Sequence, residues 1–303
     1  MSATAGTPAA RVVVVGPTSW NTNVLLDTLP EPRPHTVHAR SARDTLGGTS
    51  AGKVLHLADL GIPVTCVTVL GDDDPAARIR TALTHPGVEL LVEVVSGPSE
   101  RHINLMTDRG ERVSLYLSTP EPPPTPVPSA VATAIAAATD VVLDLAQRTV
   151  DLLSSDVPRQ ARARGTRTWT DLHDYDGSAT FHRPFLAAAD HVFLNADGLG
   201  DPLPFLHACV RSGARLAVCT LGADGAVAVD AGGREHRVAA TPTEVVDTNG
   251  AGDAFLAGYL AAAVGGADVP EALKAATRQA VRALASVHLS PLLDDPSAGR
   301  SGA

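Results

Sequence analysis

Short apolar runs alternate with stretches of helical periodicity along most of the chain. Continuous runs rich in β-branched residues, at positions 11–16 and 140–144, are typical of strands buried on both faces of a parallel sheet. Ala- and Leu-rich stretches between such runs predict helices. This alternation favours a three-layer α/β/α fold around a mostly parallel central sheet. Other core strands are expected within 61–72 and at 89–95, 166–171, 191–195 and 216–222; helices are expected up to 59, at 75–83, 129–138, 150–164 and 203–212, up to about 263, and at 270–287.

Several segments do not fit this alternation. Residues 100–117 predict a β-hairpin with its turn at 108–110, and residues 35–44 could be an extended strand away from the core. Together these segments could form a small sheet beside the core. The Pro-rich stretches 29–34 and 119–128 break regular structure. Residues 17–23 would leave the carboxyl end of the first strand, where ligands bind in open α/β sheets. A further hairpin is expected from 226–229 and 235–238.

The most informative stretch spans residues 245–258. Val245 and Val246 are expected to end a strand, and a turn of small residues then leads into a helix. A helix N-terminus carries unpaired N–H groups and a partial positive charge. The small residues Gly250, Ala251 and Gly252 would leave those groups open to an anion. Asp253 follows in the first helical turn, so an anion cradle would lie beside a proton acceptor, as phosphoryl transfer to an alcohol requires.

Composition narrows the class of protein further. The 303 residues carry a net charge of −9, and no basic cluster suggests a nucleic-acid partner. Cys66, Cys209 and Cys219 are isolated, which favours reduced thiols and a cytoplasmic setting. The start of the chain shows no signal-peptide pattern, and no apolar run reaches the ~18–20 residues of a membrane span. We therefore expect a soluble cytoplasmic protein with no membrane partner.

Three signatures in order along the chain resemble one known family. The run Asp247-Thr248-Asn249-Gly250-Ala251-Gly252-Asp253 resembles the C-terminal signature of the PfkB, or ribokinase-like, carbohydrate and nucleoside kinases. The glycine pair 47–48 and the Gly-Asp pair 71–72 resemble the N-terminal part of that family. The resemblance implies one ribokinase-like kinase domain over residues 1–303. Lid segments at about 33–48 and 99–119 would be inserted in its core, and a homodimer could form through the lid.

The resemblance also implies roles for residues on the nucleotide side. Asp253 would be the general base, with the three small residues before it as the anion hole. Mg²⁺ would bridge the phosphates of ATP, and K⁺ could bind near this loop and near residues 286–290. A family Asn-x-x-Glu motif supports magnesium, but its Glu position is Gly198 here. The cofactor-binding candidates are Thr220, Gly222, Gly225, Asn195, Asp247 and Thr248.

The substrate side departs from the ribose kinases of the family. Their Gly-Gly-Lys-Gly-Ala-Asn pattern is Gly-Gly-Thr-Ser-Ala-Gly here, and an Asp that grips sugar hydroxyls corresponds to Asn21. These changes imply an acceptor other than ribose or fructose. The substrate-binding candidates are Asn21, Gly48, Arg101 and Asn104. Lys53, one of only two lysines, is expected on a solvated helix surface.

We therefore predict an ATP-dependent kinase that moves the γ-phosphoryl group to a hydroxyl of a sugar or sugar-like polyol. A nucleoside kinase is the nearest alternative. A nucleotide- or metabolite-binding regulator without activity is an alternative of another class, motivated by Gly198 and the altered substrate positions. The polar run at 171–176 is interpreted as a loop at a strand end rather than a metal site. No protein-chelated metal and no catalytic histidine are predicted.

Overall fold

The computed structural model describes residues 11–122 and 126–294. Its main sheet has nine strands in the order β13-β12-β11-β10-β9-β8-β1-β4-β5. The strands from β11 to β5 in this order pair in parallel, while β12 and β13 pair antiparallel at one edge. The strands are β1 (Val12–Val15), β4 (Val64–Leu70), β5 (Val88–Val94), β8 (Asp140–Leu143), β9 (Arg167–Asp171), β10 (His191–Asn195), β11 (Leu216–Thr220), β12 (Ala226–Asp230) and β13 (Glu235–Val238).

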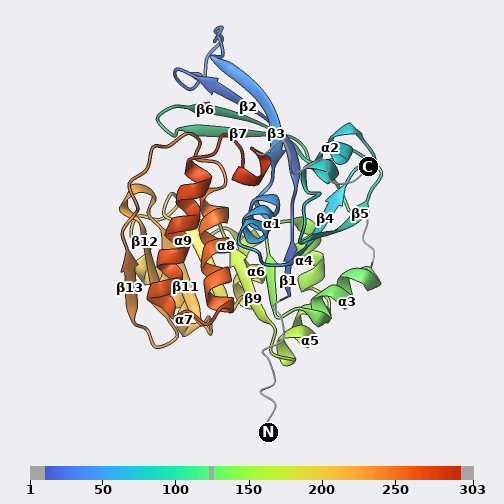
Figure 1. The fold of residues 1–303 in the computed structure, drawn as a ribbon, viewed down its shortest axis with the longest axis vertical. Coiled ribbons are helices and arrows are strands. Elements are labelled where there is room, and N and C mark those ends of the chain that lie inside the picture. Colours follow the sequence, from blue (N-terminus) through green and yellow to red (C-terminus); the bar gives the residue numbers. More distant parts are fainter. Residues whose placement is uncertain (1–10, 123–125, 295–303) are drawn as a thin grey trace.

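Helices cover both faces of this sheet (Figure 1). Alternate side chains of β1 enter two separate cores, because neighbouring residues of a strand point to opposite faces. One core is closed by α1 (Thr49–Asp59), α2 (Asp74–Ala82), α8 (Ala251–Val264) and α9 (Val269–Leu284). The other is closed by α3 (Ser129–Ala137), α4 (Gln147–Leu153), α5 (Val157–Ala163), α6 (Arg183–Ala188) and α7 (Leu203–Arg211). The expected three-layer α/β/α fold is confirmed.

A second, four-stranded sheet forms a lid beyond one end of the main sheet (Figure 1). Its strands lie in the order β3-β2-β6-β7, with β2 and β6 parallel and the outer pairs antiparallel. The lid therefore joins two segments that are far apart in the sequence. Its strands are β2 (Ser19–Leu26), β3 (Ser41–Gly47), β6 (Arg101–Thr107) and β7 (Arg112–Ser118).

The structure corrects several expected elements. Residues 19–26 form the lid strand β2, whereas the sequence predicts only that residues 17–23 leave the carboxyl end of the first core strand. Val245 and Val246 are about half exposed and belong to no strand; the N–H of Val246 instead donates to the carbonyl of Leu284, 2.8 Å away. The helix expected at 150–164 is split into α4 and α5, because Pro158 can sit only in the first turn of a new helix. The strand expected at 35–44 begins only at Ser41.

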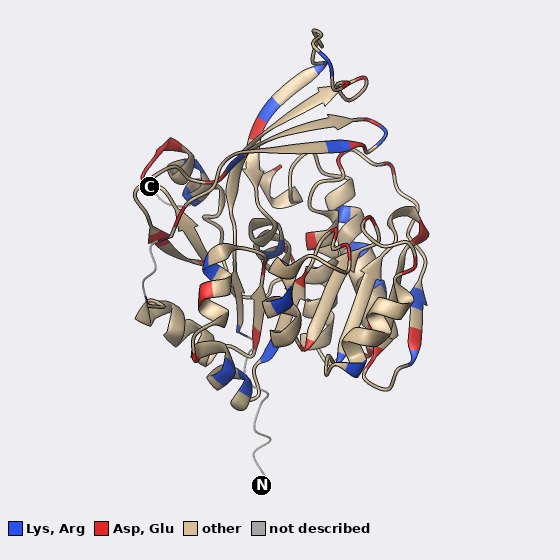
Figure 2. Cartoon of the chain, turned by 180° about the vertical axis from the view of Figure 1, so that it is seen from behind, with Lys and Arg blue, Asp and Glu red and all other residues tan. Residues whose placement is uncertain are grey.

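Charged residues of both signs are interspersed along the elements (Figure 2). Within residues 11–122 and 126–294, none of the helices has the length and apolar character needed to cross a bilayer.

Candidate active site

The site begins at the N-terminus of α8. Gly250 precedes the helix in a left-handed conformation, with φ of 78°. A Cβ at this position would lie 2.7 Å from the carbonyl oxygen of Leu289, so only glycine fits. The first full helical bond runs from the N–H of Ala254 to the carbonyl of Gly250, at 2.8 Å. The N–H of Ala251 makes only a long bond of 3.4 Å to the carbonyl of Thr248, and among the described residues no backbone partner is found for the N–H of Gly252. The first turn can therefore receive an anion, and nothing lies within 4 Å of a Cβ built on Gly252.

Asp253 lies in this first turn, and α1 holds one of its carboxylate oxygens. The hydroxyl of Thr49 donates to Asp253 Oδ1 at 2.6 Å, and Lys53 Nζ donates to the same oxygen at 2.7 Å. Lys53 also donates to the Thr49 hydroxyl. Thr49 and Lys53 are four residues apart and so share one face of α1. The Asp253 side chain keeps 11% of its surface exposed, so it is reachable but not free to rotate in solvent.

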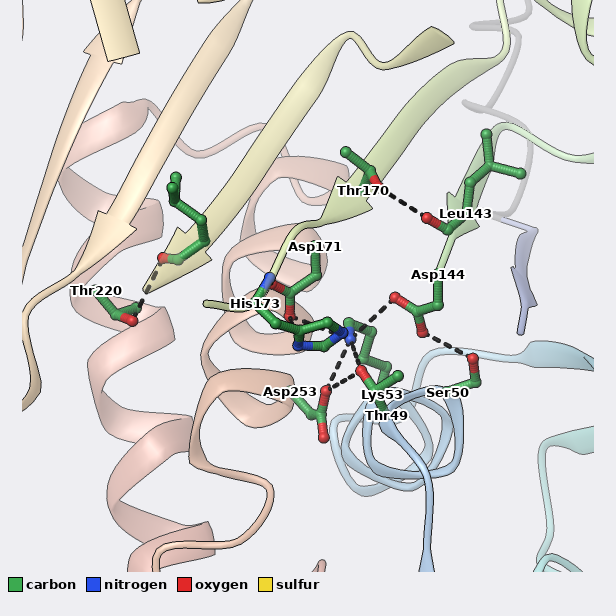
Figure 3. Close-up of polar contacts among 11 residues, drawn as sticks. Thr49, Ser50, Lys53, Leu143, Asp144, Thr170, Asp171, His173, Thr220 and Asp253 are labelled. Atoms are coloured by element: carbon green, nitrogen blue, oxygen red, sulfur yellow. Dashed lines mark hydrogen bonds and ion pairs between the residues drawn. The ribbon is translucent and has the colours of Figure 1, made fainter. Parts of the chain in front are cut away.

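Lys53 occupies the centre of a buried acidic cluster (Figure 3). Its side chain is fully buried, and the expectation of a solvated helix surface was wrong. Besides Asp253, Nζ lies 3.1 Å from Asp144 Oδ1 and 3.3 Å from Asp171 Oδ2. Asp171 ends β9 and Asp144 directly follows β8, so neighbouring parallel strands deliver both carboxylates to the same edge of the sheet. The cluster therefore joins α1, α8 and two strand ends.

Burial and charge act in opposite directions in this cluster. Burial alone would lower the pKa of Lys53, but the carboxylates, Asp144 foremost, raise it, so the ammonium is held charged. Burial raises the pKa of Asp144, although Lys53 opposes this. For Asp171, burial is outweighed by His173 and Lys53, which lower its pKa to about 2. Lys53 and Asp171 thus form an ion pair beneath the site over the whole physiological pH range.

A cavity of about 720 Å³ separates the lid from the main sheet next to this cluster. Three of the four substrate-binding candidates, Asn21, Gly48 and Asn104, line it. Asn21 accepts a hydrogen bond from the His102 N–H at 3.2 Å, and Asn104 donates to Asn23 Oδ1 at 2.9 Å. Further lining residues with polar side chains are Asn23, Thr45, Thr49, Glu100, His102, Arg112, Ser114, Tyr116, His173, Asp174, Asn195, Asp197 and Asn249.

Arg101, the fourth substrate-binding candidate, is not among the residues that line the cavity, and its role in binding stays a prediction. Side chains alternate across a strand, and in β6 it is His102 and Asn104 that face the cavity. His102 Nε2 lies 3.0 Å from Glu100 Oε1, and its ring packs on that of Tyr116 with centroids 3.8 Å apart.

The nucleotide-side candidates lie at the carboxyl ends of the last parallel strands. Asn195 ends β10, lines the cavity, and accepts a hydrogen bond from the Asp197 N–H at 2.9 Å. Thr220 ends β11, and Gly222 follows it in open space, with φ of 57°. Position 225 must be glycine for a steric reason, because a Cβ there would lie 2.0 Å from the carbonyl oxygen of Val238. Gly225 therefore closes the turn into β12, and only Gly222 leaves room for a ligand.

The lid is tied to the anion turn by two arginines. Arg43 of β3 forms an ion pair with the buried Asp247, and Arg112 of β7 donates to Asn249 Oδ1 at 2.9 Å. Asp247 Oδ1 also accepts from the Asn249 N–H at 2.8 Å, which shapes the turn. Thr248 is half-buried beside Gly110 of the lid. Asp247 and Thr248 thus support the turn and dock the lid in this structure.

The residues that sequence reasoning missed are Thr49, Lys53, Asp144 and Asp171 as one cluster. Two signals were available. Thr49 and Lys53 have helical spacing, and the two aspartates lie at the ends of adjacent predicted strands, where ligands of α/β sheets gather. Only the fold shows that these two signals meet at Lys53, whose ammonium also binds Asp253.

A parallel sheet with an anion turn, a neighbouring carboxylate and a lidded polar cavity defines a small-molecule phosphotransferase. A model of the pfkB family of carbohydrate kinases matches residues 9–290, and the chain belongs to this family. The acarbose 7(IV)-phosphotransferase of Actinoplanes sp. is 30% identical over 256 residues, covering 82% of this chain and 83% of that protein. The fructoselysine 6-kinase of Escherichia coli is 27% identical over 247 residues, covering 78% and 89%.

A solved structure supports the same conclusion. The microbiome-derived acarbose kinase Mak1 superposes with a TM-score of 0.78 at 28% identity, covering 92% of this chain and 94% of that one. The protein is an ATP-dependent sugar kinase, which transfers a phosphoryl group from ATP to a sugar hydroxyl.

Proposed function

We propose that this kinase phosphorylates a sugar-like acceptor larger than a single ribose, with Asp253 as the general base. The observation that carries the proposal is the cavity between lid and sheet. Its volume of about 720 Å³ falls within the ~300–1,000 Å³ of pockets that hold drug-sized ligands. Its wall of amides, hydroxyls and carboxylates suits a ligand with many hydroxyl groups. The relatives named for acarbose and fructoselysine support an acceptor of this size.

In the proposed step, Asp253 takes the proton of the attacking hydroxyl as its oxygen bonds to the γ-phosphorus. The bond from that phosphorus to the bridging oxygen of ATP breaks, and ADP leaves with the electron pair. The N–H groups of Ala251 and Gly252 would stabilise the charge on the transferred group, with Ala251 giving up its 3.4 Å bond to the Thr248 carbonyl. Asn21, Asn104 and the backbone near Gly48 would orient the acceptor, which makes attack effectively intramolecular.

The residues present also fit a magnesium-bound nucleotide. Asn195 and Asp197 bring amide and carboxylate oxygens to the wall of the cavity, at the end that we propose for the nucleotide. Mg²⁺ prefers oxygen ligands and retains water. Bound there with ATP, Mg²⁺ would neutralise phosphate charge. Thr220 and Gly222 are proposed to contact the nucleotide, with Asp247 and Thr248 shaping the loop. We further propose that the kinase uses K⁺ and that it is located in the cytoplasm. We also propose that residues 1–303 form a single kinase domain.

We also propose that the protein forms a homodimer through the lid. The outer face of the lid carries three apolar side chains of β7, Val113, Leu115 and Leu117, which are 41–51% exposed. The register places Leu115 opposite Ile103 and Val113 opposite Leu105, which extends this apolar face across two strands. Such a face is typical of a surface that packs against another protein surface.

The experiment is a substrate panel that includes acarbose, fructoselysine, ribose and adenosine. ADP release is measured with each acceptor, and mass spectrometry identifies the phosphorylated product. We expect the highest kcat/KM with one of the two larger acceptors. A clear preference for ribose would contradict the proposed acceptor class, and a clear preference for adenosine would favour a nucleoside kinase instead.

A further inference from the structure

We propose that Lys53 is a positioning residue of the phosphoryl transfer, which together with Thr49 and Gly52 fixes the carboxylate of Asp253. The inference rests on the assignment of Asp253 as the general base. It adds that three residues of α1 hold the carboxylate of this base in place. These residues supply a buried cation (Lys53), a hydroxyl (Thr49) and a position without a side chain (Gly52) within about one and a half turns of the helix.

Only one of the two carboxylate oxygens of Asp253 receives hydrogen bonds from side chains of the described residues. Thr49 and Lys53 both donate to Oδ1, at 2.6 and 2.7 Å (Figure 3). Among the described residues, no hydrogen bond to Oδ2 is formed. With Oδ1 held by two donors, the carboxylate cannot rotate without breaking both, so Oδ2 keeps a fixed direction. That leaves Oδ2 as the oxygen that can accept a proton.

Gly52 makes this arrangement sterically possible. A Cβ on residue 52 would lie 2.5 Å from Asp253 Oδ2 and 2.9 Å from its Cβ. Any other side chain would therefore displace the carboxylate from α1 and lengthen the bonds to Lys53 and Thr49. Gly52 has an ordinary helical backbone, so the requirement comes from Asp253 and not from the helix itself.

The positive charge of Lys53 has a second effect, which is to keep the carboxylate of Asp253 in its charged form. From α1, Asp253 is faced by Lys53 and, further away, by His56. From the strand ends, Asp144 and Asp171 belong to the same cluster, with His173 beside Asp171. Without the ammonium, Asp253 would share its surroundings with two other carboxylates, and repulsion would favour its protonated form. A protonated carboxyl group cannot accept the proton of the acceptor.

The test compares K53M and K53R with the wild-type kinase, and K274M serves as the matched control. Lys274 is the only other lysine and lies on the surface of α9, paired with Glu271. We expect K53M to lower kcat by on the order of 10²-fold, the scale of a misplaced catalytic group, with KM for ATP nearly unchanged. The acid limb of its kcat profile should move to higher pH. K53R should recover part of kcat, and K274M should match wild type.

A second variant separates positioning from folding. G52A leaves every charge in place, and alanine favours a helix over glycine, so the fold is expected to persist. We expect G52A to lower kcat at least tenfold with its melting temperature retained. If K53M does not fold, K53M/D144N restores part of the charge balance and G52A decides the question. The proposal is overturned if G52A and the folded Lys53 variant keep kcat within twofold and the acid limb unchanged. An unaffected D253N would instead overturn the general-base assignment.

Discussion

At the scale of single residues, Asp253 is the group on which the chemistry depends. D253N keeps the shape and one oxygen of the side chain but removes its ability to accept a proton. We expect kcat to fall by on the order of 10²–10⁴-fold, the contribution of a general base. The measurement is steady-state ADP release, with the melting temperature recorded alongside. D74N, which changes an exposed aspartate of α2, should leave kcat unchanged. Full turnover in folded D253N would refute the assignment.

His191 provides a prediction on stability at the same scale. Its ring stacks on Trp169 with centroids 3.8 Å apart, and burial lowers its pKa to about 4. Because this folded-state pKa lies below the usual ~6.5, the folded protein disfavours the charged ring. The stability from His191 is therefore complete above pH 6.5 and is lost as pH falls toward 4.

The expected loss from this residue between pH 7 and pH 5 is about 2 kcal/mol. Urea unfolding of wild type and H191F at the two pH values measures it. The phenyl ring keeps the stacking contact but has no titrating group, so H191F should lose about 2 kcal/mol less than wild type. Equal losses in the two proteins would show that His191 is not the source.

At the scale of elements, the lid and the anion turn are joined through Arg43 and Asp247. R43Q removes the charge that holds β3 against the turn. Because the acceptor lies under the lid, we expect KM for the acceptor to rise and kcat to fall together, each by roughly tenfold, as for other residues that control lids. R33Q is the matched control, since Arg33 pairs with Glu31 on the surface, outside the lid strands. Identical kinetics for the two variants would exclude a role for the lid contact.

The elements also show where local pattern succeeds and where it fails. The start of α8 was predicted from consecutive residues, because glycine content and helix polarity are local properties. Strand β2 was not, because residues 19–26 become a strand only by pairing with β3 and with the distant β6. The sequence also could not show that Arg101 lies outside the cavity lining, since the face that a strand turns to a cavity depends on its register with its neighbours.

At the scale of the whole molecule, the apolar outer face of the lid predicts that two copies of the protein associate through it. L115E places a charge in the middle of the exposed apolar face formed with Val113 and Leu117. We expect it to shift a wild-type dimer to monomer in sedimentation experiments, because an unpaired charge in an apolar interface costs several kcal/mol. L60E, at an exposed leucine after α1, is the control. A wild-type protein that is already monomeric would contradict the proposed dimer.

The sequence by itself determined the alternation of strands and helices, the anion turn before α8, and Asp253 as the candidate base. Each of these depends on residues that are close together in the chain. Only the tertiary structure decided that Lys53 is buried among Asp144, Asp171 and Asp253. These residues come from α1, β9, α8 and the position after β8, and any two of them are at least 27 positions apart in the sequence. A lysine in a helix pattern is expected in water, where it is well solvated. It is stable inside this protein because the fold surrounds it with carboxylates.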